Sequence, residues 1–160
     1  MNRPVRLNLP PADLRFRPDA DSRRGGLEVY DRWRDKWVAL TPEEWVRQHF
    51  VHYLTDILHY PVHLIGNEVS VRFNGMARRC DSVVYDTRLR PVAVVEYKAP
   101  SVRLTPEVFG QILRYNSVLM APCIMVSNGM RHFACLRKPD GTYSYAESIP
   151  SFESLICALD

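Results

Sequence analysis

The chain has 160 residues and a formal net charge of +3, with 46% hydrophobic and 24% charged residues. This predicts one soluble globular domain with a single core. No apolar run approaches the roughly 20 residues that a membrane helix needs, and the N-terminus lacks the apolar segment of a secretory signal. We therefore expect a cytoplasmic address and no membrane partner.

The N-terminal residues 1–26 are rich in Pro, Arg and Asp and show no hydrophobic period. They predict a loosely ordered basic arm, which is followed by a single domain over residues 27–160. The aromatic-rich segment 27–40 is expected to pack as a short hairpin. A helix then begins at Thr41, which can cap it, with Pro42 in its first turn, and it ends before Pro61.

The middle of the chain predicts three successive strands, over residues 67–73, 76–85 and 92–99, and Asn74-Gly75 is a strong hairpin turn between the first two. A second helix is expected over residues 105–120. Further strands follow at 123–127, 131–137 and 143–146. This αβββαβ order predicts an α/β fold with a central mixed β-sheet flanked by helices.

The cysteines and arginines give weaker signals. Four cysteines without a CxxC spacing are expected to be reduced thiols that pack as small apolar residues. Arginines far outnumber lysines, which suits contact with phosphates, although genome composition explains the same bias equally well.

Charged residues interrupt the third predicted strand. Glu96 and Lys98 are two apart and therefore share a face. Asp81 lies on the preceding strand, on a face with Val83 and Tyr85, and would come level with Glu96 if the two strands are antiparallel neighbours. Two adjacent carboxylates repel each other, and a hard cation such as Mg²⁺ relieves that repulsion. We expect Asp81 and Glu96 to bind the metal and Lys98 to act on water or on developing negative charge. An ordinary ion pair at a strand end is the alternative, and the pattern alone leaves the two readings about even.

Both predicted helices carry candidate site residues. Gln111 and Tyr115 are four apart, on the stripe expected to face the sheet, where the amide would need a polar partner. A half-exposed glutamine beside a core tyrosine is the alternative. In the first helix, Glu43 is on the face expected to point to the core, and Glu44 is in the capping-box position relative to Thr41. Which glutamate approaches the sheet stays open.

Four runs, in chain order, carry a resemblance to a known family: "RDKWVALTPEEWVRQHF", "RRCDSVVYD", "VVEYKAPSVRLTPEVFGQILRYN" and "MVSNG". They resemble the N-terminal nuclease domain of type I restriction enzyme R subunits, within the PD-(D/E)xK nuclease superfamily, over about residues 27–150. The resemblance implies a restriction-endonuclease-like core that cleaves DNA with Mg²⁺, for which Mn²⁺ can substitute. The residues that match the family's pattern are its metal ligands, Asp81 and Glu96; its catalytic lysine, Lys98; its Gln-x-x-x-Tyr motif, Gln111 and Tyr115; and its auxiliary acid, Glu43 or Glu44.

The chain also departs from that pattern. Cys80 stands where the superfamily has proline, and the chain has no Walker A motif, whereas R subunits continue into a helicase-like motor. We therefore expect a stand-alone relative or a fragment, with DNA and other restriction-system subunits as partners. The alternative is a catalytically silent DNA-binding or protein-interaction module that retains the fold. The candidate phosphate contacts are Arg78, Arg79, Arg103 and Arg114.

Overall fold

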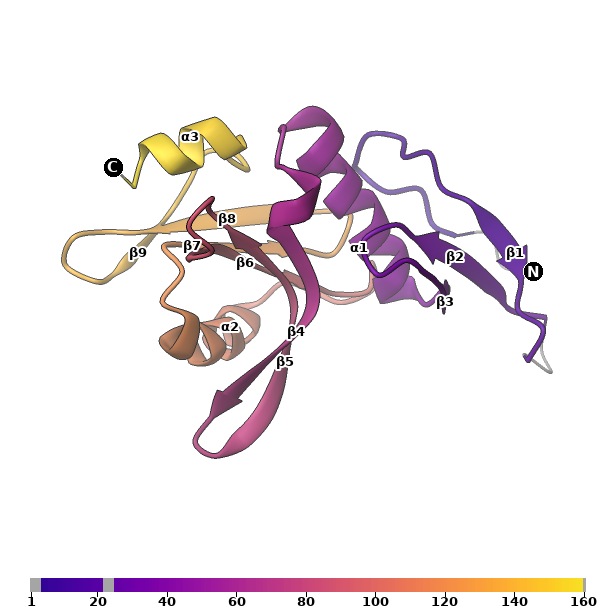
Figure 1. Cartoon of the computed structure of the whole chain (residues 1–160), viewed down its shortest axis with the longest axis horizontal. Coiled ribbons are helices and arrows are strands. Elements are labelled where there is room, and N and C mark those ends of the chain that lie inside the picture. The colour runs from indigo at the N-terminus through magenta and orange to yellow at the C-terminus, as the bar shows by residue number, and fades with distance from the viewer. Residues whose placement is uncertain (1–3, 22–24, 160) are drawn as a thin grey trace.

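The computed structural model describes residues 4–21 and 25–159. Over these residues the main sheet has six strands in the order β4-β5-β6-β7-β8-β9 (Figure 1). Their bounds are β4 (Ile65–Phe73), β5 (Met76–Tyr85), β6 (Pro91–Tyr97), β7 (Cys123–Ser127), β8 (His132–Arg137) and β9 (Tyr143–Tyr145).

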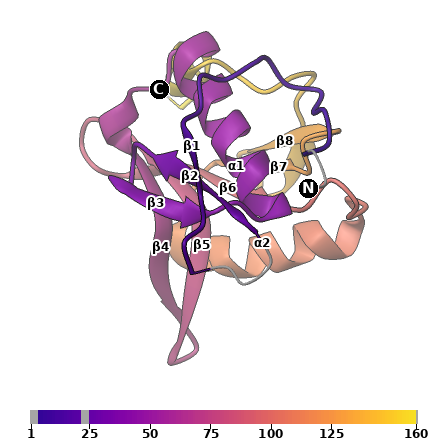
Figure 2. The ribbon, with the colours of Figure 1, turned by 90° about the vertical axis from the view of Figure 1, so that its right-hand side faces the viewer.

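Helices lie on both faces of this sheet (Figures 1 and 2). α1 (Pro42–His52) begins as predicted, with Thr41 Oγ accepting a hydrogen bond from the Glu44 N–H (3.1 Å), and it continues into a π-helical turn, Tyr53–Ile57. α2 (Pro106–Leu119) covers the other face, and Met120 ends it in a left-handed conformation. A 3-10 turn (Val62–Leu64) precedes β4, and a short α3 (Phe152–Cys157) follows β9.

The sheet is mixed because one strand pair differs from the rest. β6 and β7 are parallel, and α2 is the crossover between them, while the other neighbouring pairs are antiparallel. A parallel pair requires such a long connection, which is commonly a helix. The predicted α/β class, its mixed sheet and its αβββαβ order are therefore confirmed.

The N-terminal segment differs from the loosely ordered arm that the sequence predicts. β1 (Phe16–Pro18) pairs with β2 (Leu27–Asp31), which pairs with β3 (Lys36–Ala39), so a short part of the N-terminal segment and the expected hairpin share one antiparallel sheet beside α1 (Figure 2). Leu7 is buried in the main core, and the Asn8 N–H donates to the Gly129 carbonyl (2.8 Å). These contacts anchor the described part of the segment to the core, and single anchoring contacts of this kind leave no hydrophobic period in the sequence. Residues 1–3 and 22–24 of that segment lie outside the described residues.

The core has a part on each side of the main sheet. Val95 and Tyr97 pack toward α1 against Phe50, and Val94 packs toward α2 against Ile112. β6 is therefore buried on both faces, which explains its apolar sequence. The four cysteines are free thiols: Cys80, Cys123 and Cys135 are buried, and Cys157 is exposed. Within the described ranges, none of the helices has the length and apolar character needed to cross a membrane.

Gly129 provides a test of how the N-terminal segment is anchored. Its φ is +79°, and a Cβ there would lie 2.6 Å from Leu7 Cδ2 and 3.0 Å from Val46 Cγ2. We expect Gly129→Ala to lower the free energy of unfolding through two effects, backbone strain at positive φ and overpacking of the core by the added methyl. The overpacking should add about 1–3 kcal/mol to the loss that the strain alone would cause. Gly75→Ala is the matched control, since its φ is +75° and nothing lies within 4 Å of its added Cβ. Urea denaturation measures both, and equal losses would contradict the anchoring.

Candidate active site

Asp81 and Glu96 come together where β5 and β6 part. The ladder between these strands ends at the pair Ser82 and Val95, and the same register places Asp81 opposite Glu96. Here the Tyr97 N–H donates to Asp81 Oδ2 (2.9 Å) rather than to a ladder carbonyl. Lys98 follows the last residue of β6, and its ammonium donates to Glu96 Oε1 (3.0 Å). The two predicted carboxylates and the predicted lysine therefore form one cluster.

The charges in this cluster oppose one another. Burial and then the negative charge of Asp81 raise the pKa of Glu96 to about 7, against the contrary effect of Lys98, and Glu43 raises it further. Burial lowers the pKa of Lys98, but Glu96, Asp81 and Glu43 outweigh it and the net shift is upward. Burial, and then the charges of Glu96 and Asp81, raise the pKa of the Cys80 thiol to about 11. The site thus carries a negative field that a cation would relieve.

Asp81 is oriented by α1, which the sequence did not predict. Arg47 Nη2 donates to Asp81 Oδ1 (3.1 Å). The expectation that Asp81 shares a face with Val83 and Tyr85 is wrong, because those two side chains pack on the α2 side of the sheet. Strand alternation breaks at this level, where Glu68 has a φ of +54° and the β4–β5 ladder shows no Glu68–Asp81 pair. The carboxylate of Asp81 can therefore reach α1.

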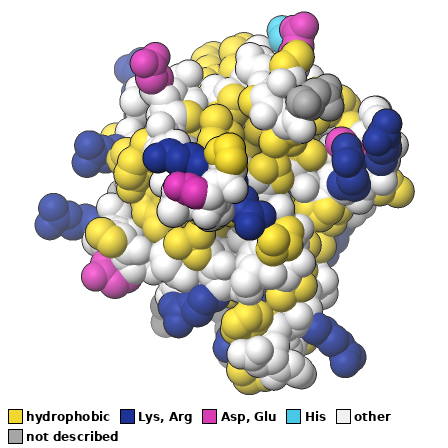
Figure 3. Space-filling model, turned by 90° about the vertical axis from the view of Figure 1, so that its left-hand side faces the viewer, with side chains coloured by type: hydrophobic (Ala, Val, Ile, Leu, Met, Phe, Trp, Pro, Cys, Tyr) yellow, Lys and Arg dark blue, Asp and Glu magenta, His cyan; other side chains and the backbone are white. Residues whose placement is uncertain are grey.

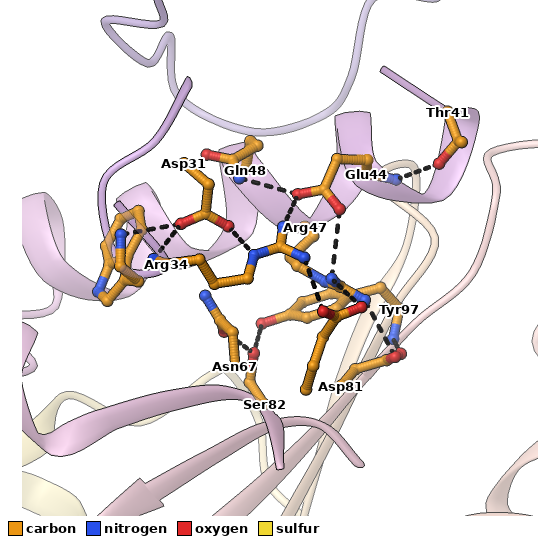
Figure 4. A network of polar contacts seen from close by, with 12 residues as sticks. Asp31, Arg34, Thr41, Glu44, Arg47, Gln48, Asn67, Asp81, Ser82 and Tyr97 are labelled. Carbon is orange, nitrogen blue, oxygen red and sulfur yellow. Dashed lines mark hydrogen bonds and ion pairs between the residues drawn. The ribbon is translucent and has the colours of Figure 1, made fainter. Parts of the chain in front are cut away.

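Arg47 belongs to a series of paired charges, buried or partly buried, that we call the ion relay: Asp31, Arg34, Glu44, Arg47 and Asp81 (Figure 4). Arg34 lies in the turn between β2 and β3, pairs with Asp31 and donates to Glu44 Oε1 (2.5 Å). Glu44 Oε2 accepts in turn from Arg47 (3.2 Å). The relay therefore connects the small N-terminal sheet to the candidate metal ligand.

The relay also separates the two glutamates of the first helix. Glu44 is 7% exposed, and its carboxylate binds Arg34, Arg47 and Gln48 instead of completing a capping box. Glu43 is exposed, so the expectation that it faces the core is wrong. Its charge nevertheless acts on Glu96 and Lys98. Of the two, Glu43 is therefore the candidate auxiliary acid, and Glu44 is a structural partner of Arg47.

The predicted pair on α2 is only partly brought to the site. Tyr115 packs half-buried in the cluster of Val71 and Val83, next to the strand that carries Asp81. Gln111 is exposed, and the buried residues of α2 are Ile112 and Asn116, so the expectation that Gln111 faces the sheet is wrong. A turn of 100° per residue makes neighbouring stripes hard to distinguish when both contain apolar residues.

The donor set at the site suits a hard cation. Within residues 4–21 and 25–159, no group of three or more His, Cys, Asp or Glu side chains is arranged to hold a metal ion. The charge of Asp81 still raises the pKa of Glu96, and this repulsion between the two carboxylates is what a divalent cation would offset. Mg²⁺ usually takes only one or two carboxylates and completes its shell with water and phosphate oxygens. The residues present therefore fit Mg²⁺ rather than a metal that needs a full protein cage.

The ion relay predicts a large difference between two nearby arginines. Arg34→Met removes the partner of the fully buried Asp31 and of Glu44, so we expect the free energy of unfolding to fall by about 3–5 kcal/mol. Arg32→Met is the control, because Arg32 pairs with Asp56 at a site where both side chains are well exposed, and it should cost less than about 1 kcal/mol. Urea denaturation measures both, and similar losses would argue against the relay.

The raised pKa of Glu96 predicts how stability depends on pH without metal. Its folded-state value of about 7 exceeds the ordinary 4.5, so its proton is held more tightly in the folded protein. Its contribution to stability is therefore lost as pH rises from about 4.5 to about 7. Glu96→Gln should raise the melting temperature at pH 8 in chelator, by about 2–4 °C per kcal/mol of relieved charge burial, and should have little effect near pH 4. The exposed Glu147→Gln is the control; a lower melting temperature for Glu96→Gln at pH 8 would contradict the analysis.

A search of curated proteins finds no match. Among solved structures, the chain is similar to a fragment described as an HsdR subunit of a type I restriction enzyme from Vibrio vulnificus YJ016, with a TM-score of 0.58 and 18% sequence identity. The match covers 75% of this chain and 25% of that one, so the chain spans about a quarter of the fragment's length. This likeness supports the restriction-endonuclease-like fold.

The family model for the type I restriction enzyme R protein N terminus matches residues 42–150. That range runs from the start of α1 to just before α3 and contains the strands that carry Asp81 and Glu96. It excludes the small N-terminal sheet and Arg34. The match spans more than half of the sequence, and the chain therefore belongs to the family of the type I restriction enzyme R protein N terminus.

Proposed function

We propose that this chain is a metal-dependent DNA endonuclease domain that hydrolyses phosphodiester bonds. The observation that carries the proposal is the meeting of Asp81, Glu96 and Lys98 at the point where β5 and β6 part. Such an arrangement is costly for folding, since it buries one carboxylate beside another. A cost of this kind is typical of groups held in place for chemistry.

Each residue of the cluster has a separate role in this proposal. Bound Mg²⁺ would supply a Lewis acid for a phosphate oxygen and a water of lowered pKa. Asp81 and Glu96 would hold it, with Asp81 kept in position by Arg47 and by the Tyr97 N–H. Lys98 carries a protonated ammonium at neutral pH, and its raised pKa strengthens that preference. Its positive charge would stabilise the negative charge that develops on the attacked phosphate and on the sugar oxygen that leaves.

A second candidate is a catalytically silent DNA-binding or protein-interaction module that retains the fold. Two observations favour it. Both oxygens of Asp81 already accept hydrogen bonds, and no described group of three or more metal-binding side chains is present. In that case Lys98 and Glu96 would be an ordinary ion pair at a strand end, and the nuclease fold would serve as a scaffold within a restriction system.

Plasmid cleavage separates the two candidates. Supercoiled plasmid is incubated with Mg²⁺ or Mn²⁺ and with wild type, Asp81→Ala or Lys98→Ala, and nicked product is measured. We expect each substitution to lower the rate by about 100-fold or more, because each removes a group that acts on the reacting phosphate or water. Lys138→Ala is the matched control for Lys98→Ala, since Lys138 is exposed near the far end of β8.

Calorimetric titration with Mn²⁺ gives a second readout that does not depend on turnover. Wild type should bind Mn²⁺, and Asp81→Ala should not. Equal nicking by wild type, Asp81→Ala and Lys98→Ala would overturn the assignment of the site. Absence of both nicking and Mn²⁺ binding in the wild type would favour the silent module.

A further inference from the structure

The β4–β5 hairpin extends past the rest of the main sheet at the candidate active site. β5 pairs with β6 only from Ser82 onward, whereas β4 and β5 stay paired out to Phe73 and Met76. Residues 70–79, which we call the β-finger, are therefore a two-stranded ribbon, and in both ribbon views it projects from the body (Figures 1 and 2). It begins next to Asp81, where the sheet loses its third strand.

The β-finger carries unbalanced positive charge. Its sequence, SVRFNGMARR, contains Arg72, Arg78 and Arg79 and no acidic residue. Arg79 pairs with Glu68 (3.3 Å) at the base of the finger. Arg72 and Arg78 are exposed and have no ion pair among the described residues. In Figure 3 the lower protrusion accordingly bears dark-blue and yellow side chains and no magenta.

The end of the β-finger is apolar. Phe73 and Met76 lie directly opposite each other beside the Asn74-Gly75 turn, and Met76 is 52% exposed. A ribbon with cationic flanks and an apolar end has the composition of elements that lie in a DNA groove, because the flanks meet phosphates while the end meets base edges. The pair also stabilises the ribbon itself, as cross-strand apolar pairs do, but the 52% exposure of Met76 leaves an apolar surface at the end of the ribbon.

The spacing along β5 fits a nucleic-acid backbone. Arg78 is three residues from Asp81, or about 10 Å at the rise of a strand. That length corresponds to roughly three nucleotides of one DNA strand. Arg72 lies on β4 opposite Ala77, which is four residues before Asp81 on β5. Because Ala77 and Arg78 are neighbours on β5, Arg72 and Arg78 lie on opposite faces of the ribbon. The two guanidinium groups are therefore on opposite sides of the ribbon, as the two walls of a groove require.

We propose that the β-finger lies in a groove of duplex DNA beside the candidate active site, with Arg72 and Arg78 on phosphates of the two strands. This inference rests on the proposed function for its substrate, and it adds the element that holds the duplex in register with Asp81 and Glu96. The partner is a phosphate backbone, so binding through the β-finger depends steeply on salt.

The test is equilibrium binding of a labelled duplex at several salt concentrations, in chelator so that no cleavage occurs. Arg72→Ala/Arg78→Ala should lower the slope of log affinity against log salt by about 1.8, at about 0.9 for each lost phosphate contact, and should weaken binding roughly tenfold or more at 0.1 M salt. The matched control is Arg88→Ala/Arg137→Ala, which removes two exposed arginines from the opposite end of the sheet, near the start of β6 and the end of β8. Its slope should change by much less.

Three results would overturn the β-finger proposal: no duplex binding by the wild type at low salt, an equal loss of slope in both double variants, or the same loss of slope on single-stranded DNA of equal length. Melting temperatures of the variants confirm that the fold is intact. Because the experiment contains no metal, it is independent of the nuclease proposal. If duplex binding depends on the β-finger but plasmid is never nicked, the proposal for the β-finger stands and the nuclease proposal is rejected.

Discussion

The bond between Arg47 and Asp81 is the interaction on which the candidate site depends. It brings a sheet carboxylate under α1, at a level where β5 has lost its regular alternation. Arg47 keeps that position because Glu44 holds it, and Glu44 is held in turn by Arg34. Each charged side chain of the ion relay would destabilise the fold if it were buried without a partner, and the opposite charges of its neighbours offset that cost. The fold around Asp81 is thus maintained by a set of charges rather than by any single pair.

Folding and the proposed chemistry make opposite demands on β6. The strand runs between two apolar clusters, and its burial on both faces stabilises the sheet. Near its end the strand places the buried Glu96 beside Asp81, and Lys98 offsets part of the repulsion on Glu96. The conflict is confined to the end of the strand, where β5 and β6 separate and where a phosphate could approach. The interior residues of the strand pack in the two apolar clusters.

Much of the fold follows from local sequence patterns. The strands, the turn at Asn74-Gly75 and the Thr41 cap are encoded by neighbouring residues, and so is the juxtaposition of Asp81 with Glu96, once β5 and β6 are taken as a hairpin. The role of Arg47 was missed because its partner is 34 residues away in sequence. A charged residue among buried positions of an otherwise amphipathic helix was the available signal. The exposure of Gln111 was missed because a helical stripe is defined only to within about one residue by its period.

The thiols of this chain differ sharply in their access to reagents. Burial raises the pKa values of Cys80, Cys123 and Cys135, which disfavours the reactive thiolate, and none of the three is exposed. Cys157 lies exposed on α3, at the end of the molecule away from the β-finger (Figure 1). A maleimide dye would therefore mark one native position in the folded protein, and a spectroscopic distance from that dye to a labelled duplex end would report the direction in which bound DNA runs.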